Sequence, residues 1–114
     1  MKVKEAIERS SVIYPSDMDK NRIIEWINEL EARIYTELFK EPFQSITDGD
    51  AELRAPEGYA ELYPLYLMMK RELACGDCER YSALALAFGD AYYEYANYVN
   101  RTRQPSGATY FKTV

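Results

Sequence analysis

The stretch 77–103 limits what this chain can fold into more than any other part of the sequence. It has no proline and one internal glycine, and its apolar and aromatic residues recur at steps of three and four. That spacing predicts an α-helix with one buried side. The residues of this side are Tyr81, Leu84, Ala85, Phe88, Ala91, Tyr92, Tyr95, Tyr98 and Val99. Asp77 suits the start of the helix, because its carboxylate can accept hydrogen bonds from the first free backbone N–H groups.

A helix over 77–103 has a length of about 35–40 Å, which is more than the core of a domain of this size requires. Part of its tyrosine-rich surface is therefore expected to meet another molecule. Tyr93 lies off the predicted buried side, and it is our candidate residue for a subunit interface.

Three shorter segments also have helical patterns, at 1–9, 19–39 and 57–75. Leu73 belongs to the predicted buried side of the third segment. Pro64 leaves two possibilities for this helix, because proline fits the first turn of a helix and disrupts its middle. Either the helix starts with Pro64 at its first position, or it is kinked there.

Gly76 is a natural helix stop, and the return to the next helix is short. The helices at 57–75 and 77–103 are therefore expected to form an antiparallel hairpin that packs on 19–39. The sequence predicts an all-α fold, a small helical bundle with a long C-terminal helix, in a single domain over 1–114.

The segment 40–56 interrupts the helical pattern. It has a proline near each end and a turn sequence at 48–50. Two pieces of extended character, at 43–46 and 52–55, predict a short β-hairpin or a protruding loop. A segment of this length is more typical of a functional projection than of a passive connector.

The tail 104–114 starts with turn-forming residues and ends in a β-prone sequence that contains Tyr110 and Phe111. Two interpretations stay open. The tail is either a frayed end or a flexible arm that adds a strand to a neighbouring subunit.

Histidine is absent, which removes the commonest general base, the commonest zinc ligand and the usual triad member. The two cysteines, Cys75 and Cys78, form one CxxC pair, whereas a closed zinc site needs four ligands. Two thiols at a helix junction are the favoured interpretation, with a metal site shared between chains or a redox dithiol as alternatives. We therefore expect neither an enzyme nor a cofactor.

The formal net charge is −5. This balance argues against a protein that binds nucleic acid by neutralising phosphates. No apolar run is long enough to span a membrane, and the charged N-terminal segment has no signal-peptide core. The sequence therefore predicts a soluble, cytoplasmic protein without membrane contact.

A set of residues occurs in a characteristic joint order: Leu53, Pro56, Tyr59 to Tyr63, Tyr66, Gly76, Glu79 to Ser82, Leu86, Phe88, Ala91, Tyr92, Tyr95, Tyr98, Asn100 to Thr102 and Pro105. This order resembles a family of small head–tail connector proteins, also described as adaptor or head-completion proteins, of tailed phages and Gram-positive prophages. The similarity covers most of the chain, is strongest from Pro56 to Pro105 and is vague before Arg22, although Glu31 to Tyr35 also fits. Cys75, Cys78 and Pro64 depart from the expected pattern.

The resemblance implies a mostly helical subunit that forms a ring of about a dozen copies beneath the portal protein. Such a ring extends the DNA channel without binding DNA specifically, and it offers a platform to the next head-completion or tail protein. The expected location is the host cytoplasm during assembly and then the head–tail junction of the virion.

In such a ring, the acidic loop at 47–52 is a candidate to face the channel through Asp48, Asp50 and Glu52. The tail is a candidate portal-binding or neighbour-binding arm through Tyr110 and Phe111. An alternative function is a free acidic interaction protein that mimics DNA and inhibits a host protein.

Overall fold

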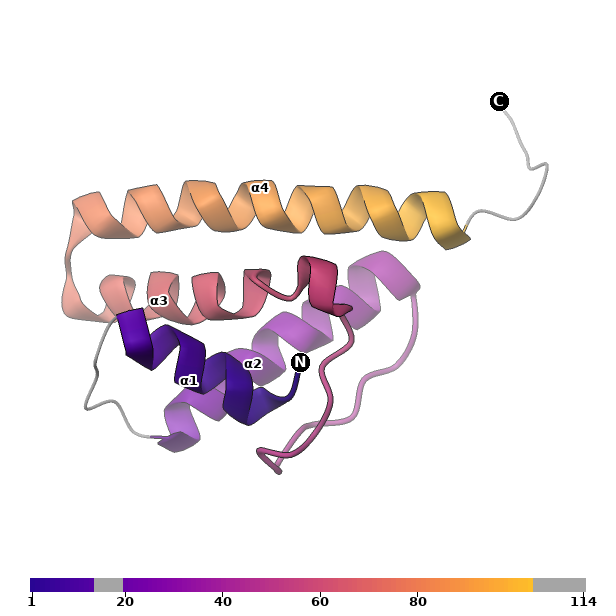
Figure 1. Ribbon diagram of the computed structural model, residues 1–114, viewed down its shortest axis with the longest axis horizontal. Coiled ribbons are helices and arrows are strands. Elements are labelled where there is room, and N and C mark those ends of the chain that lie inside the picture. Colours follow the sequence, from indigo (N-terminus) through magenta and orange to yellow (C-terminus); the bar gives the residue numbers. More distant parts are fainter. Residues whose placement is uncertain (14–19, 104–114) are drawn as a thin grey trace.

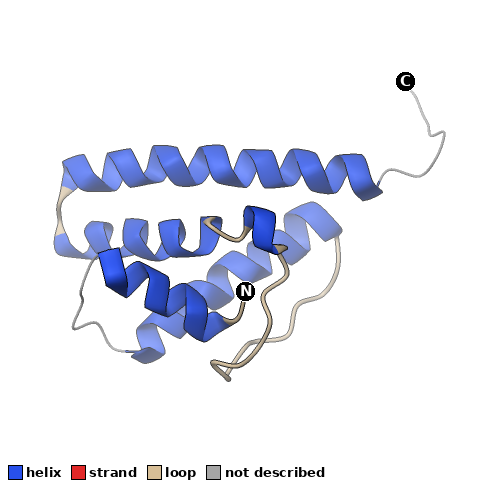
Figure 2. Cartoon of the chain, in the orientation of Figure 1, coloured by secondary structure: helices blue, strands red, loops and turns tan. Residues whose placement is uncertain are grey.

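The computed structural model describes residues 1–13 and 20–103, which form helices joined by loops (Figures 1 and 2). The elements, in chain order, are α1 (Val3–Ile13), α2 (Lys20–Ile34), a π-helical turn η1 (Tyr35–Phe39), a 3₁₀ turn η2 (Glu57–Tyr59), α3 (Leu62–Cys75) and α4 (Cys78–Arg103). The predicted all-α fold with a long C-terminal helix is confirmed.

The helices are arranged around α3. It packs against α4 on one side and against α1 and α2 on the other. Figure 1 shows α4 as the outermost layer, running the length of the molecule above α3. Among the described residues, no helix is both long enough and apolar enough to cross a lipid bilayer.

The turn between α3 and α4 follows from two residues. Gly76 has a φ of 82°, a left-handed conformation that glycine adopts without steric penalty. Its N–H donates to the carbonyl oxygen of Glu72 at 3.0 Å. Asp77 Oδ1 accepts a hydrogen bond from the backbone N–H of Arg80 at 3.1 Å, as predicted for the cap of α4. The predicted antiparallel hairpin is thereby formed.

The start of α3 decides between the two possibilities for Pro64. The helix begins at Leu62, so Pro64 lies in its first turn, where a backbone N–H has no intrahelical acceptor. Pro64 is the third residue of α3 and lies within its first turn, close to the first of the two possibilities. The prediction for Leu73 was wrong, because its side chain is 54% exposed; it lies in the last turn of α3, near the hairpin end.

The predicted inner face of α4 is buried against α3 and the preceding turn. Phe88 lies 5.1 Å from the ring of Tyr66 and 5.8 Å from the ring of Tyr92, measured between centroids. Near the other end, Tyr59 and Tyr98 stack at 4.6 Å. Leu84 packs against the same core. This aromatic row joins α4 to the rest of the bundle.

The second predicted helix ends at Phe39 as expected, although its last turn is π-helical. Ile27, Leu30 and Ile34 are completely buried. Lys40 follows with a φ of 55°, and this left-handed residue ends the helix. The predicted start of the helix, at Asp19, lies outside the described residues.

The segment between η1 and η2 is a packed loop. Asn28 holds its middle at two points, since its Nδ2 donates to the carbonyl oxygen of Ile46 and its Oδ1 accepts from the N–H of Ile46. In the described residues the two extended pieces do not pair as the suggested hairpin. Glu52 instead forms an isolated antiparallel bridge with Lys2.

Candidate functional site

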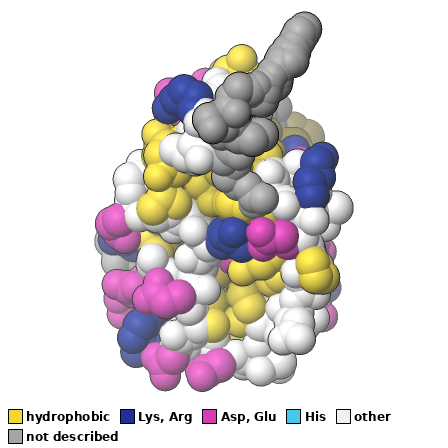
Figure 3. All heavy atoms as spheres, turned by 90° about the vertical axis from the view of Figure 1, so that its right-hand side faces the viewer, with side chains coloured by type: hydrophobic (Ala, Val, Ile, Leu, Met, Phe, Trp, Pro, Cys, Tyr) yellow, Lys and Arg dark blue, Asp and Glu magenta, His cyan; other side chains and the backbone are white. Residues whose placement is uncertain are grey.

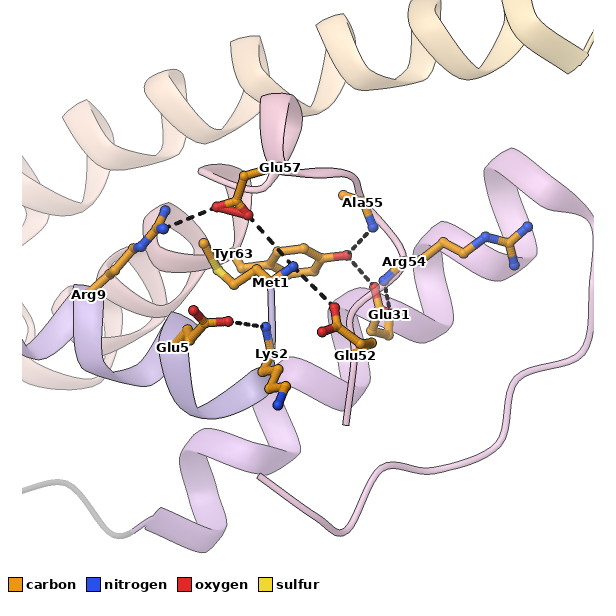
Figure 4. Close-up of polar contacts among 10 residues, drawn as sticks. All are labelled: Met1, Lys2, Glu5, Arg9, Glu31, Glu52, Arg54, Ala55, Glu57 and Tyr63. Atoms are coloured by element: carbon orange, nitrogen blue, oxygen red, sulfur yellow. Dashed lines mark hydrogen bonds and ion pairs between the residues drawn. The ribbon is translucent and has the colours of Figure 1, made fainter. Parts of the chain in front are cut away.

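A buried carboxylate lies at the junction of α2, α3 and the loop. Glu31 is 1% exposed and Tyr63 is completely buried. The hydroxyl of Tyr63 donates to Glu31 Oε1 at 2.7 Å, and the N–H of Arg54 donates to Glu31 Oε2 at 2.9 Å. The N–H of Ala55 donates to the hydroxyl oxygen of Tyr63 at 2.9 Å. Figure 4 shows these contacts converging on the Tyr63 hydroxyl and Glu31.

Burial raises the pKa of Glu31, while the hydrogen bonds from Tyr63 and Arg54 oppose this rise. Burial, together with the adjacent Glu31 carboxylate, also raises the pKa of the Tyr63 hydroxyl. A carboxylate with a raised pKa is often a functional group, although structural networks produce the same effect. Here both carboxylate oxygens accept bonds from the protein itself, so the cluster acts as an internal clamp between α2, α3 and residues 54–55.

The predicted acidic loop lies against the N-terminal segment. Lys4 Nζ contacts Asp50 Oδ1 at 2.8 Å, and the amino group of Met1 contacts Glu52 Oε2 at 3.3 Å. Asp48 Oδ1 accepts from the N–H of Asp50 at 3.0 Å. The hydrogen bond and charge of Lys4 lower the pKa of Asp50. Two of the three predicted channel carboxylates are thus partly neutralised by the chain's own cations.

The loop is also part of the core at its C-terminal end, which the sequence pattern did not indicate. Leu53 and Ala55 are buried, and the N–H of Val3 donates to the carbonyl oxygen of Ala51 at 3.0 Å.

Figure 3, which views the molecule from the end where α4 finishes, shows Asp and Glu side chains gathered over the lower half of this face. Hydrophobic side chains lie open above and between them.

The outer face of α4 carries two of the large hydrophobic side chains that are exposed in the described part of the chain. Tyr93 is 67% exposed and Leu86 is 70% exposed. They are seven residues apart in the sequence, about two helical turns, so they lie on the same side of the helix. Gly89 and Asp90, which lie between them, are also exposed. Tyr93 therefore lies on a surface that suits its predicted role in an interface.

The end of the α3–α4 hairpin carries a second apolar surface. A hollow of about 310 Å³ is lined by Glu72, Leu73, Gly76, Asp77, Cys78, Tyr81 and Ser82. Cys75 and Cys78 are exposed free thiols at this end. Among residues 1–13 and 20–103, no three side chains of the His, Cys, Asp and Glu types are grouped to hold a metal ion. The candidate arm residues Tyr110 and Phe111 lie outside the described residues.

Comparison with known proteins found no matching family model, no matching curated protein and no matching solved structure. The function must therefore be argued from the residues and their geometry.

The sequence analysis did not identify two residues of the outer face of α4 and one contact of the interior. Leu86 and Gly89 were not selected, although their spacing from Tyr93 places all three on the side opposite the predicted buried stripe. A helical projection of the exposed residues would have found them. The pairing of Glu31 with Tyr63 joins residues far apart in the chain, and no local pattern indicates it.

Proposed function

We propose that this protein is a structural subunit that assembles with copies of itself into a ring at the head–tail junction of a tailed phage or prophage particle. The ring, of about a dozen copies, lies beneath the portal protein and extends the DNA channel. Its other side receives the next head-completion or tail protein. The subunit is made in the host cytoplasm and stays in the virion.

The two-sided character of α4 carries this proposal. One side of the helix supplies the aromatic core, and the other side keeps Leu86 and Tyr93 in solvent. A large aromatic residue and a leucine exposed on one rigid helix form a surface typical of protein contacts. A ring subunit needs such a surface, because each copy must contact its neighbours.

The charge of the chain also supports a DNA conduit. A net charge of −5 repels the phosphate backbone, so that DNA slides past without adhering. Asp48 is exposed, and its carboxylate has only the neighbouring N–H of Asp50 as a hydrogen-bond donor among the contacts described above. It is the loop carboxylate best suited to face such a channel.

The DNA-mimic alternative is less well supported. A mimic presents an array of free carboxylates to a basic partner, whereas several carboxylates here are paired with cations of the same chain. Arg9 contacts Glu57 at 3.1 Å, and Arg54 contacts Glu41 at 3.0 Å. Such pairs reduce the negative field that a basic partner would meet.

The test is assembly on purified portal rings. The full chain is expected to bind portal as a ring, seen by electron microscopy, and to complete DNA-filled heads that lack a connector. Tyr93→Asp should fold normally and fail to form the ring, because it places a charge in the contact. Glu94→Gln, an exposed change on the same helix, is the matched control. A parent chain that never binds portal would overturn the proposal.

The arm is tested separately, by removing the residues after Gly107. The truncated chain should melt at nearly the temperature of the full chain and attach more weakly to portal. Unfolding of the truncated chain would mean that the arm belongs to the core. Normal head completion would mean that it is a frayed end.

A further inference from the structure

The hollow at the end of the α3–α4 hairpin contains a leucine that the spacing of its helix predicts to be buried. Leu73 belongs to the apolar side of α3, yet its side chain is 54% exposed. The hollow has a volume of about 310 Å³, near the lower end of the range for ligand pockets. Cys78 and Tyr81 add apolar surface to its lining. Its size suits an inserted side chain better than the broad surface of a folded domain.

The arm, residues 104–114, has side chains of the kind that such a hollow binds. Tyr110 and Phe111 are adjacent aromatic residues. Aromatic side chains that enter a pocket contribute much of the binding energy of protein interfaces. A turn-forming sequence at 105–107 precedes them, and it allows the arm to leave the direction of α4.

Pairing of the arm as a strand has no counterpart in the described part of the chain. An arm that adds a strand needs the free edge of a sheet. Residues 1–13 and 20–103 form helices and helical turns, with one isolated bridge between Lys2 and Glu52. An arm that binds another copy of this chain therefore binds through its side chains.

The length of the arm excludes the hollow of its own chain. The arm starts after Arg103, whereas the hollow lies around residues 78–82 at the opposite end of α4 (Figure 1). At ~1.5 Å per residue, these positions are about 32–38 Å from Arg103. Phe111 is eight residues past Arg103, so its backbone reaches at most about 29 Å, and the chain must first turn back. The hollow that the arm can fill is that of a second copy.

The charges of the arm and the hollow are complementary. Lys112 is the one charged side chain of the arm. The described residues that line the hollow include the carboxylates Glu72 and Asp77 and no basic side chain. Arg80 contacts Glu72 at 3.6 Å, so Asp77 is the better placed of the two for Lys112. Lys112 follows Phe111 directly, and an inserted Phe111 ring brings the ammonium group to this acidic rim.

We propose that Tyr110 and Phe111 of one copy insert into the hollow at the hairpin end of the next copy, where they cover Leu73. Each copy gives an arm at one end of α4 and receives an arm at the other end. Such a head-to-tail contact joins unlike surfaces, as a ring of identical subunits requires. This inference rests on the proposed function and deepens it, because it names where one subunit holds its neighbour.

Disulfide cross-linking tests where the arm lies. One chain keeps Cys78 and carries Cys75→Ser, and the other carries Cys75→Ser, Cys78→Ser and Thr109→Cys. Oxidised glutathione should link the two chains into a heterodimer when they are mixed. In the matched control the receiving thiol is moved to Ala87, which is exposed and outside the hollow, and linkage should be at least tenfold slower. Equal rates at the two positions would overturn the proposal.

A single chain that carries Cys75→Ser, Cys78 and Thr109→Cys tests the direction of the contact. Each copy then has one thiol for the copy before it and one for the copy after it, so oxidation should give a ladder of linked dimers, trimers and longer chains. An intramolecular disulfide in a monomer would mean that the arm folds back on its own chain. Linkage that stops at dimers would mean a reciprocal exchange between two copies. Either result would overturn the proposal.

Binding of the free arm tests the residues of the hollow. A labelled peptide of residues 104–114 should bind, by fluorescence anisotropy, to a full chain whose own two arm aromatics are replaced by alanine. Leu73→Asp in this chain should raise the Kd at least tenfold, because it places a charge in the apolar lining. Ala87→Asp, the control, should leave the Kd unchanged, with the fold of both variants checked by circular dichroism. Lys112→Glu in the peptide should weaken binding about two- to fivefold, as expected for an exposed ion pair.

These experiments use the free chain without portal, so the docking and the ring can fail separately. Absence of saturable binding up to about 1 mM peptide would overturn the docking. Rings that still form on portal in that case would leave the proposed function intact. Docking in solution without rings on portal would instead refute the proposed function and keep the contact between copies.

Discussion

Both faces of α4 carry large apolar or aromatic residues, but one face is buried and the other is exposed to solvent. Phe88 on the inner face is 5% exposed, whereas Leu86, two residues earlier, is 70% exposed. The difference comes from helical rotation, which turns consecutive residues to different sides. Hydrophobicity alone therefore does not tell core from surface in this helix. Whether a face of α4 is buried depends on what packs against it. In the described chain, α3 packs against the inner face.

The comparison extends to what each face does for stability. The inner face adds aromatic contacts at ring distances of 5.1 to 5.8 Å, which are within the range of favourable ring pairs. The outer face adds no comparable contact within the described chain. Substitutions on the inner face should therefore change folding, and substitutions on the outer face should change association.

The largest effect is expected at the centre of the inner face. Phe88→Ala should lower the free energy of unfolding by about 3–5 kcal/mol, because it removes a buried ring and leaves a cavity. Urea denaturation measures this loss. Leu86→Ala is the control, and it should change the free energy by no more than about 0.5 kcal/mol. Equal losses at the two positions would mean that both faces are packed.

The second-largest effect is expected at the contact between α2, α3 and residues 54–55. Hydrogen bonds of Glu31 and Tyr63 hold this contact, whereas aromatic rings hold the contact of α4. Tyr63→Phe keeps the ring and removes the hydroxyl, which leaves the N–H of Ala55 and one oxygen of Glu31 without these partners. Buried polar groups without partners are costly, and we expect a loss of about 2–3 kcal/mol. Tyr93→Phe, an exposed tyrosine on α4, should be nearly neutral in the same denaturation assay.

The inner face of α4 and the Glu31–Tyr63 cluster also differ in how well the sequence predicted them. The inner face of α4 follows a period of three and four, so the buried positions from Tyr81 to Val99 were identified correctly. The cap at Asp77 and the stop at Gly76 were also correct, since both depend on local backbone chemistry. Local patterns therefore predicted the α3–α4 hairpin.

The clamp and the loop were not predicted because they depend on contacts between distant segments. Glu31 meets Tyr63 across 32 positions of the chain, and a glutamate on a helix is ordinarily a solvated residue. Leu73 fits the period of α3 but lies in its last turn, where the short link to α4 leaves it uncovered. The spacing of apolar residues predicts on which side of a helix a residue lies. Whether that residue is buried depends on which segment packs against that side.

A pH effect should separate the clamp from the aromatic row. Because burial raises the pKa of Glu31 in the folded chain, the folded state holds a proton that the unfolded state has already released. The contribution of Glu31 to stability is therefore complete below the unfolded pKa, near 4.5, and falls as the pH rises through the higher folded pKa. The effect should be smaller than that of Tyr63→Phe, because two hydrogen bonds oppose the shift.

The measurement is the difference in unfolding free energy between the parent chain and Glu31→Gln at several pH values. This difference should decrease as the pH rises above about 4.5, because only the parent titrates at position 31. The carboxylates of Glu37 and Asp50 have lowered pKa values in the folded chain, and they act in the opposite direction. They are present in both proteins, so the subtraction removes them. A difference that does not vary with pH would contradict the raised pKa.

The smallest effect has the opposite sign and belongs to the outer face. Gly89→Ala should raise the free energy of unfolding by about 0.5–1 kcal/mol, because alanine is the better helix former and its methyl group meets nothing within 4 Å. Gly76→Ala is the informative control: its φ of 82° is strained for alanine, and this variant should lose about 1–2 kcal/mol. Thermal melts in dilute solution compare the two. A loss at Gly89 would mean that this glycine serves the subunit's own fold.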